Sequence, residues 1–316
     1  MKKIRTVSLI GLGAIGAAYG SKLHQYLGDD FTVVANEERI SRYQQSGIKV
    51  LEETYNFRYE TPETDSGPRD LVIFSVKNAE LKQAIQEIKH HIGPDTIILS
   101  LLNGISSEEE IYEATENAHI LHSMCVGIDA VRENQQIRFS SLGKICFGYR
   151  EDFGTEEDAQ AVKTLFDAAA IPYEIPQDIW HAIWAKFMLN VGVNQVSAVK
   201  RAPYEYFHKV PSLYSWMEDA MYEVVEISKK AGVGLTDEDV KNFRPILHAL
   251  SPKGKTSMLQ DIEGNRKTEV EYFAGTVVEL GKKYHVPTPI NEQLLRMITI
   301  MEKMNALDVK ASSVNI

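Results

Sequence analysis

The sequence predicts an α/β protein in which a doubly wound parallel sheet is followed by an all-helical domain. Short apolar runs without alternation recur in the first half of the chain, separated by stretches of helical spacing, as in a parallel sheet covered by helices. After Ile175-Pro176-Gln177-Asp178 no comparable β-like run appears. Because 316 residues suggest about two domains, we expect one domain over 1–176 and a helical one over 177–316.

The elements of the first domain follow from the spacing of apolar residues. Four runs are typical of strands buried on both faces: Thr6–Ile10, Phe31–Ala35, Leu71–Val76 and Thr96–Leu101. Helical spacing predicts helices over 14–27 and 79–90, and polar alternation predicts a hairpin over 47–59. Two further runs, 120–125 and 144–148, extend the predicted sheet.

In the second domain, one apolar stripe predicts a helix that begins after Pro211 and ends at Gly232. Its members are Leu213, Trp216, Met217, Ala220, Val224, Ile227 and Ala231. A second stripe, formed by Phe273, Val277 and Leu280, predicts another helix further along the chain. These patterns indicate a domain built almost entirely of helices.

A glycine motif, Gly11-Leu12-Gly13-Ala14-Ile15-Gly16, follows the first predicted strand and opens the first predicted helix. In this context the first glycine permits a tight turn, the second admits a pyrophosphate, and the third lets helix and strand pack closely. The phosphates would rest on amides at the helix N-terminus. The motif therefore predicts a Rossmann-type dinucleotide-binding domain, with these six residues at the cofactor; the alternative is a glycine-rich turn of another α/β protein.

The position that reads the ribose lies about 20 residues past the glycines, at Asn36, Glu37 and Arg39. An acidic residue there favours NAD, whereas an arginine pairs with the 2′-phosphate of NADP. Both types are present, and the sequence leaves open which side chain faces the ribose. These residues could equally be solvated ones that open the next helix.

A polar stripe in the helical domain consists of Lys186, Asn190 and Asn194, spaced i, i+4 and i+8. On a helix they lie within an arc of about 80° and span about 12 Å. A cation flanked by two amides suits a small anionic substrate, and the lysine can give a proton to a carbonyl oxygen that becomes an alkoxide. The alternative is a snorkelling lysine with two structural asparagines.

Two more polar residues interrupt apolar surroundings. Glu269 precedes Phe273, Val277 and Leu280 at helical spacing, which puts a carboxylate near the start of an apolar helix face. Ser257 lies one turn before Asp261 in a short helical segment. The alternatives are an interaction of Glu269 with its own helix N-terminus and a helix cap at Ser257.

Taken in order, these motifs resemble the ketopantoate reductase (2-dehydropantoate 2-reductase) family over essentially the whole chain. The features that carry the resemblance are Gly11 to Gly16, Ser75-Val76-Lys77, Leu102-Asn103-Gly104, the stripe Lys186/Asn190/Asn194, Ser257 to Ile262, and Thr268-Glu269. Two departures stand out. Asn36 occupies a position where NADP-dependent members commonly place arginine, and Tyr204 replaces a substrate-binding asparagine of the best-known members.

The resemblance implies an NADPH-dependent reduction of 2-dehydropantoate to (R)-pantoate in pantothenate and coenzyme A biosynthesis. It implies that Lys186 is the proton donor and that Glu269 holds substrate, lysine and cofactor in register. The other implied positions are Asn103, Asn190, Asn194 and Ser257 at the 2-ketoacid substrate, and Asn36, Arg39, Lys77, Asn103 and Ala130 at the cofactor. NADP(H) is the favoured cofactor, with NAD(H) as the alternative.

Two other functions stay open at this point. One is an NADH-dependent D-2-hydroxyacid dehydrogenase for branched or aromatic 2-ketoacids, which the two departures would suit. The other is a non-catalytic nucleotide-sensing protein, which would need the glycine motif but neither Lys186 nor Glu269.

The amino-acid composition limits the classes of partner that we expect for this chain. With 44 acidic against 34 basic residues the net charge is −10, so we expect no nucleic acid or anionic membrane surface as a partner. No window is apolar over the roughly 18 residues of a membrane span. The only cysteines, Cys125 and Cys146, and the nine histidines show no ligand spacing, so we expect no metal and a reducing, cytoplasmic compartment. A homodimer is left open.

Overall fold

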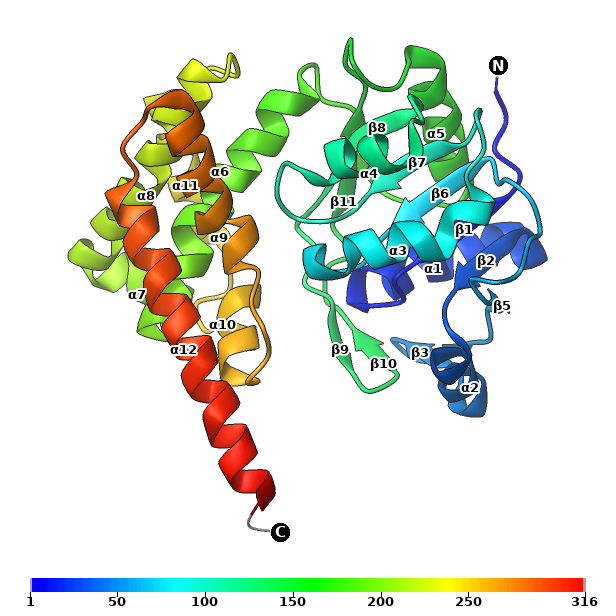
Figure 1. Ribbon diagram of the computed structural model, residues 1–316, viewed down its shortest axis with the longest axis horizontal. Coiled ribbons are helices and arrows are strands. Elements are labelled where there is room, and N and C mark those ends of the chain that lie inside the picture. The colour runs from blue at the N-terminus through cyan, green and yellow to red at the C-terminus, as the bar shows by residue number, and fades with distance from the viewer. Residues whose placement is uncertain (1, 315–316) are drawn as a thin grey trace. The chain divides into compact units, whose positions relative to one another are not determined.

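The computed structural model describes residues 2–314, and their side chains through residue 307. It contains an eight-stranded sheet in the order β12-β11-β8-β7-β6-β1-β2-β5 (Figure 1). Its strands are β1 (Val7–Ile10), β2 (Phe31–Val34), β5 (Arg58–Glu60), β6 (Leu71–Phe74), β7 (Ile97–Ser100), β8 (Ile120–Val126), β11 (Lys144–Gly148) and β12 (Tyr173–Glu174). All neighbours pair in parallel except β8 and β11, which are antiparallel. The predicted doubly wound sheet is confirmed.

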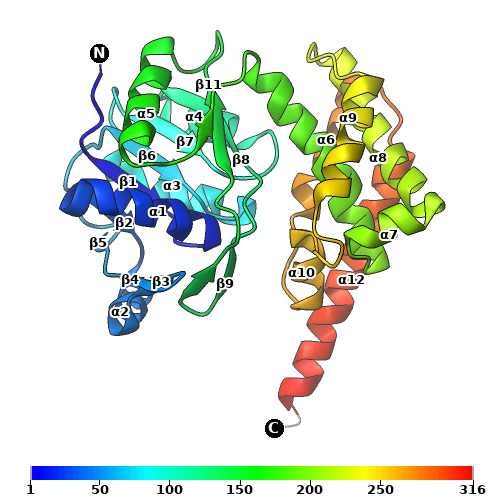
Figure 2. The ribbon, with the colours of Figure 1, turned by 180° about the vertical axis from the view of Figure 1, so that it is seen from behind.

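Helices cover both faces of this sheet (Figures 1 and 2). On one face lie α1 (Ala14–Leu27) and α5 (Glu156–Ala168), and on the other α3 (Leu81–Ile88) and α4 (Ser107–Thr115). Each face has its own apolar core, and β1 contributes Leu9 to the first and Ile10 to the second. Strands buried on both sides explain why the apolar runs in the sequence do not alternate.

The register of the parallel strands aligns their carboxyl ends. Ile10 of β1 is level with Val34 of β2 and Phe74 of β6, and Phe74 is level with Ser100 of β7. The loops that follow these four strands therefore emerge at one edge of the sheet. The chain passes from β1 to β2 on one side and reaches β6 on the other, so a topological switch point lies there, where α/β sheets bind their ligands.

A smaller sheet has the strand order β4-β3-β10-β9. Its strands are β3 (Ile48–Val50), β4 (Glu53–Tyr55), β9 (Val131–Glu133) and β10 (Gln136–Arg138), and α2 (Glu37–Ser46) precedes it in the chain. The hairpin predicted over 47–59 is correct only for β3 and β4, because residues 58–60 leave it and join β2 as β5. The hairpin of β9 and β10 was not predicted.

The rest of the described chain is helical. Its elements are α6 (Ile179–Lys200), α7 (Tyr204–Lys209), α8 (Pro211–Lys230), α9 (Asp237–Ala249), α10 (Ser257–Glu263), a 3₁₀ turn η4 (Val270–Tyr272), α11 (Ala274–Tyr284) and α12 (Pro289–Val314). Further 3₁₀ turns in the sheet region are η1 (Gly28–Asp30), η2 (Asn78–Glu80) and η3 (Lys89–His91). The predicted all-helical second half is confirmed, and α8, from Pro211 to Lys230, lies within two residues of the expected bounds.

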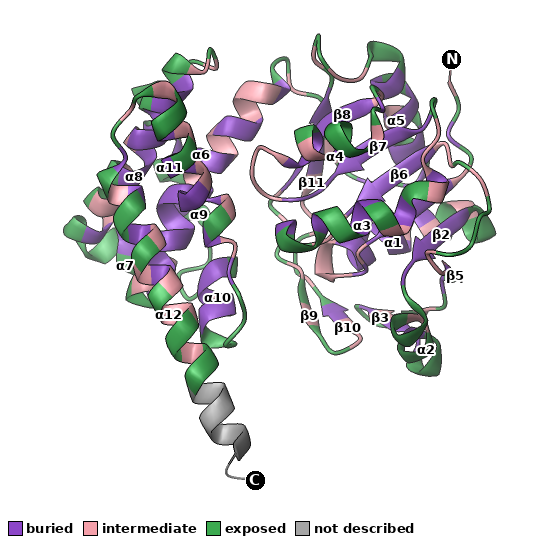
Figure 3. Ribbon diagram, in the orientation of Figure 1, coloured by how far each residue is buried: buried purple, intermediate pink, exposed green. Residues whose placement is uncertain are grey.

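Helix α6 is the centre of the helical half, and every residue from 190 to 198 is buried (Figure 3). Gln195 of α6 accepts a hydrogen bond from the Ala274 amide at the start of α11 (3.1 Å) and donates to Asn291 of α12 (3.1 Å). Asn291 in turn donates to Glu223 of α8 (2.7 Å). This buried polar network ties four helices together with its members satisfied.

The chain divides into two compact units, Met1–Trp180 and His181–Ile316. The division lies four residues beyond the expected boundary after residue 176. Two contacts assign the first turn of α6 to the sheet unit. A Cβ at Gly148 would meet the side chain of Ile179 at 3.0 Å, and the ring of Trp180 lies 5.1 Å from that of His122. Within the described residues, no helix is both long and apolar enough to cross a bilayer.

Candidate active site

The three glycines of the loop after β1 have different surroundings. Gly11 has φ +97°, and a Cβ there would meet the Ser75 carbonyl oxygen at 2.4 Å. A Cβ at Gly16 would meet the Gly11 carbonyl oxygen at 2.1 Å. Around Gly13 the nearest atom is the Ser75 oxygen at 3.9 Å. The first and third glycines are therefore needed for turn and packing, whereas the second leaves the backbone open to an approaching group.

The loop leads directly into α1, whose N-cap is Gly13 with no side-chain cap. The first-turn amides therefore have no side-chain acceptor from the cap residue, which leaves an anion site at the positive end of the helix. Leu12 is buried, and Ala14 and Ile15 are half-buried beside it. This donor set fits the pyrophosphate of a dinucleotide.

At the end of β2, Asn36 is the N-cap of α2, and its Oδ1 accepts a hydrogen bond from the Arg39 amide (2.9 Å). Glu37 and Arg39 are exposed. The Arg39 guanidinium lies 3.9 Å from the Glu80 carboxylate, which follows β6. The Asn36 side-chain oxygen is engaged in capping α2. Arg39 is therefore the cation that is available at the ribose-reading position on the side of Glu80.

The loops after β6 and β7 are joined by Asn78, a residue that the sequence analysis did not select. Its Nδ2 donates to the Asn103 carbonyl oxygen (2.9 Å), and its side chain is buried. Lys77 is exposed directly before it, and Asn103 is half-buried. The expected cofactor residues Lys77 and Asn103 thus lie on two loops that this hydrogen bond links. The only sequence signal was that Asn78 follows Ser75-Val76-Lys77.

Ala130 precedes β9 and packs half-buried against the core of the sheet unit. Two residues further on, Arg132 donates a hydrogen bond through Nη1 to the Leu12 carbonyl oxygen of the glycine loop. The sequence does not predict this arginine as a site residue, because nothing in the local pattern connects residue 132 to residue 12.

In the helical unit, the polar stripe lies on α6. Asn190 and Asn194 are buried, and the Asn194 Nδ2 donates to the Asn190 Oδ1 at 3.4 Å. Lys186, one turn earlier, is half-buried. The helix therefore keeps the i, i+4, i+8 face over a little more than two turns, with two amides close together in a buried segment.

The surroundings of Glu269 differ from the expectation. Glu269 is half-buried and precedes η4, while α11 begins only at Ala274, because the Phe273 backbone (φ −110°, ψ −87°) interrupts the helix. The expected place of this carboxylate at the start of a continuous helix face is wrong. The neighbouring Thr268 amide and hydroxyl both donate to Glu302 (2.7 and 2.6 Å), which fixes the segment.

Ser257 is the first residue of α10 and is exposed. The cap of this helix is Thr256, whose hydroxyl accepts from the Leu259 amide (3.2 Å), so the alternative that Ser257 serves as the cap is wrong. Tyr204, the departure noted above, begins α7 and donates its amide to the Gly254 carbonyl oxygen (3.1 Å). Burial raises the pKa of the Tyr204 hydroxyl.

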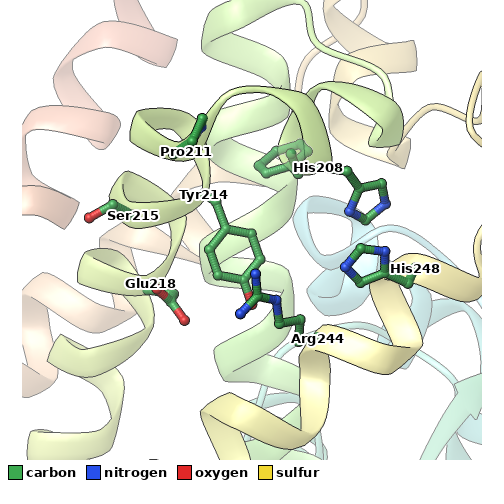
Figure 4. Close-up of a pocket in the computed structure, with 8 residues that line it drawn as sticks. His208, Pro211, Tyr214, Ser215, Glu218, Arg244 and His248 are labelled. Carbon is green, nitrogen blue, oxygen red and sulfur yellow. The ribbon is translucent and has the colours of Figure 1, made fainter.

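A cavity of about 180 Å³ opens between α7, α8 and α9 (Figure 4). The His208 and His248 rings stack across it at 3.9 Å, and the Arg244 guanidinium lies 5.1 Å from the Tyr214 ring. None of the predicted site residues lines this cavity. Among the described side chains, no group of three or more His, Cys, Asp or Glu could hold a metal ion.

A parallel sheet with a glycine loop at its switch point, followed by a helical unit with a buried polar stripe, defines the class: an oxidoreductase that uses a nicotinamide dinucleotide. Residues 7–152 match the family Ketopantoate reductase PanE/ApbA, and residues 178–302 match its C-terminal part. The chain belongs to the ketopantoate reductase family. Members are NAD(P)H-dependent oxidoreductases acting on a CH–OH group, so the alternative of a non-catalytic sensor is wrong.

Individual relatives are distant. A 2-dehydropantoate 2-reductase of Aquifex aeolicus is 27% identical over 309 residues, 95% of this chain and 98% of that protein. The fold is similar to D-mandelate dehydrogenase in complex with NADH and anilino(oxo)acetate, with a TM-score of 0.86, 21% identity, and 95% and 99% of the two chains covered. It is also similar to a dimeric ketopantoate reductase from Staphylococcus aureus, with a TM-score of 0.79, 18% identity and the same coverage.

Proposed function

We propose that this chain catalyses the NADPH-dependent reduction of 2-dehydropantoate to (R)-pantoate, a step of pantothenate and coenzyme A biosynthesis. The observation that carries the proposal is the match to the ketopantoate reductase family over both halves of the chain. The 2-dehydropantoate 2-reductase of Aquifex aeolicus supports the same substrate. The buried amide pair on α6, with Lys186 one turn away, supplies the chemistry that a small ketoacid needs.

In this reaction the reduced nicotinamide supplies a hydride when bound. Lys186 donates a proton to the C2 carbonyl oxygen as that oxygen gains charge, which lowers the barrier to forming an alkoxide. Asn190 and Asn194 bind the carboxylate and hydroxyl of the ketoacid through their amide groups. Burial of this pair strengthens these hydrogen bonds and holds the ketone in one orientation.

The remaining positions take supporting roles in the proposal. Ser257 and Asn103 contact the substrate, and Glu269 keeps substrate, lysine and cofactor in register. The glycine loop binds the pyrophosphate, while Lys77, Asn103 and Ala130 line the cofactor. In the proposal, residues 1–176 form the dinucleotide-binding domain and residues 177–316 form the helical substrate domain.

The NADPH preference rests on Arg39. Asn36 engages its side-chain oxygen in the cap of α2, so its amide oxygen is not aimed at a ribose. Arg39 is exposed, and its pairing with Glu80 at 3.9 Å is long enough for a phosphate to replace that partner.

A second candidate is an NADH-dependent D-2-hydroxyacid dehydrogenase that acts on branched or aromatic 2-ketoacids. Two observations favour it: Tyr204 stands where the best-known ketopantoate reductases have an asparagine, and D-mandelate dehydrogenase has a similar fold. The Tyr204 ring lies beside Gly254, three residues before Ser257, and an aromatic side chain would suit an apolar substrate group better than a polar one.

Steady-state kinetics with a matrix of two ketoacids and two cofactors tests the proposal. We expect kcat/KM for ketopantoate with NADPH to exceed that for 2-ketoisocaproate with NADH by at least about tenfold, or about 1.4 kcal/mol. If 2-ketoisocaproate with NADH is the better pair by that factor, the second candidate replaces the first. No consumption of either cofactor with any 2-ketoacid would contradict both.

The proposal also includes a homodimer in the cytoplasm. The dimer is supported by the Staphylococcus aureus enzyme of similar fold, and the compartment by Cys125 and Cys146, which are buried thiols and not halves of a disulfide. Sedimentation of the purified protein at several concentrations tests the dimer, because a monomer throughout would contradict it.

A further inference from the structure

The hairpin of β9 and β10 places one arginine against the glycine loop. The Arg132 Nη1 donates to the Leu12 carbonyl oxygen, and its Nε donates to the Asn134 carbonyl oxygen at 2.6 Å. The guanidinium carbon lies 5.5 Å from the centre of the Tyr43 ring on α2. Arg132 therefore lies between the loop after β1 and the helix after β2, with all contacts inside the sheet unit.

This position is held by buried neighbours. Arg132 pairs across the hairpin with Ile137, which is fully buried in the core. Tyr43 is also buried, and its ring packs 5.8 Å from that of Tyr59. A guanidinium fixed by two hydrogen bonds and an aromatic face loses little further freedom when it binds a ligand.

Arg132 has no acidic side chain as a partner among the described residues. In the part of the chain that the structure describes, no carboxylate forms an ion pair with Arg132, and its hydrogen-bond acceptors are backbone carbonyl oxygens. These two bonds engage two of the five N–H groups that a guanidinium carries. A half-buried cation with spare donors, beside a loop shaped for phosphate, suits a phosphate ligand.

We propose that Arg132 binds the 2′-phosphate of NADPH. The inference rests on the proposed function, because it assumes that the glycine loop binds the dinucleotide. Leu12 lies between the first two glycines, and α2 opens at the ribose-reading position, so a group that spans Leu12 and α2 flanks the adenosine ribose. Arg39 would approach from the Glu80 side and Arg132 from the hairpin side.

Direct binding measurements distinguish binding of the 2′-phosphate by Arg132 from binding of the pyrophosphate and from a structural role in the loop. The variants are Arg132→Gln, Arg132→Lys and, as a matched control, Arg138→Gln; Arg138 is exposed on the same hairpin and donates to Gln136 at 3.0 Å. The ligands are NADPH, NADH, 2′,5′-ADP and 5′-ADP, titrated by fluorescence or calorimetry. Thermal unfolding of each variant is measured in parallel.

For R132Q we expect the Kd of NADPH and 2′,5′-ADP to rise by about tenfold or more, with NADH and 5′-ADP changed by less than about threefold. R132K keeps the positive charge but not the planar guanidinium group. Its Kd values for NADPH and 2′,5′-ADP should therefore lie between those of the unsubstituted protein and those of R132Q. R138Q should match the unsubstituted protein. In turnover, the KM for NADPH should rise with kcat unchanged, as expected for binding that is uniform along the reaction.

An equal rise in Kd for all four ligands would overturn the assignment, because it would point to the pyrophosphate or to a disturbed loop. Unchanged Kd values would overturn it as well. If R132Q does not fold, the Kd values of R132K test the assignment in the same way: only the ligands with a 2′-phosphate should bind more weakly. A failure of the proposed function is distinguishable in the unsubstituted protein, which would then bind NADH and 5′-ADP more tightly than NADPH and 2′,5′-ADP, or bind neither dinucleotide.

Discussion

The three glycines of the loop after β1 differ in the atoms that surround them, and these surroundings indicate a different physical role for each glycine. Gly16 lies against the Gly11 carbonyl oxygen, so that α1 can approach β1 closely, whereas a Cβ at Gly13 would meet nothing closer than the Ser75 oxygen at 3.9 Å. The spacing of these residues was enough to predict that the turn and the packing require Gly11 and Gly16, because the loop is local in sequence. That Gly13 admits a pyrophosphate stays a prediction. Arg132 could not be predicted, since its contact with Leu12 crosses 120 residues and depends on a hairpin that the sequence did not reveal.

Gly16→Ala and Gly13→Ala should therefore differ in their effects. In G16A the new methyl group would overlap a backbone oxygen, so we expect a loss of about 1–3 kcal/mol in stability together with weak cofactor binding. G13A should unfold within about 0.5 kcal/mol of the unsubstituted protein, yet bind NADPH at least about tenfold more weakly, because its methyl group fills ligand space. Thermal unfolding and fluorescence titration measure both. Equal stability of the two variants would contradict this account of the loop.

Lys186→Met tests the proposed proton donor. Methionine is close in length but carries no proton, so kcat should fall by about two orders of magnitude or more, while the Kd of NADPH changes by less than about twofold. Lys200→Met is a matched control on the same helix, where the lysine is exposed and lies 5.3 Å from the Trp216 ring. Near-normal kcat in K186M would remove Lys186 from the mechanism.

For helices and strands, the sequence predicted the elements correctly where proline or glycine marks an end and where apolar residues follow a clear spacing. Pro211 and Gly232 bracket α8, and the non-alternating apolar runs became buried strands. Weak patterns failed: only Ile137 of the hairpin formed by β9 and β10 is buried, so its sequence gives little signal. The apolar spacing around Phe273 did not reveal the break between η4 and α11, because the break lies in the backbone angles.

The start of α12 depends on one buried carboxylate. Glu223 of α8 accepts from the amides of Ile290 (2.7 Å) and Asn291 (3.0 Å) and from the Asn291 side chain. Glu223→Ala would leave these donors without an acceptor, so we expect a loss of about 2 kcal/mol or more in the free energy of unfolding. Glu226→Ala, at an exposed position of the same helix, should cost less than about 0.5 kcal/mol. Urea denaturation of both variants measures the difference, and equal midpoints would contradict it.

At the scale of the whole molecule, the sheet unit contains buried histidines that must stay neutral. His122 lies between the rings of Phe153 (5.7 Å) and Trp180 (5.1 Å), and neither ring nitrogen has a hydrogen-bond partner among the described residues. Burial, together with the nearby Arg150, lowers the pKa of His122 to about 4, against a smaller opposing effect of Asp152. Burial and Arg69 also lower the pKa of His91.

An imidazole with a lowered pKa binds fewer protons in the folded than in the unfolded chain. Its contribution to stability is complete above the unfolded pKa of about 6.5 and is lost as the pH falls toward the folded value of about 4 for His122. The loss from His122 is at most about 3 kcal/mol. We therefore expect the urea midpoint of the protein to fall steeply over this range.

His122→Phe should make this fall shallower while leaving the protein at least as stable near neutral pH, because an apolar ring replaces an unsatisfied polar one. His248→Phe, at an exposed position stacked on His208, should alter the acid dependence less than H122F does, because burial is the first cause that lowers the pKa of His208. Urea midpoints at about pH 7.5 and about pH 5 provide the comparison. An unchanged slope in H122F would mean that other groups govern acid unfolding.

The division between the two units falls inside α6, after its second residue, where the backbone is fully helical. Proteases cut most readily at extended, exposed linkers. The division itself lies in a helix, and the irregular, largely exposed residues 175–178 directly precede that helix. Limited digestion should therefore cut at 175–178 before it cuts at the division. Anyone who wishes to express the halves independently must cut a helix, and should leave Ile179 and Trp180 attached to the sheet on which they pack.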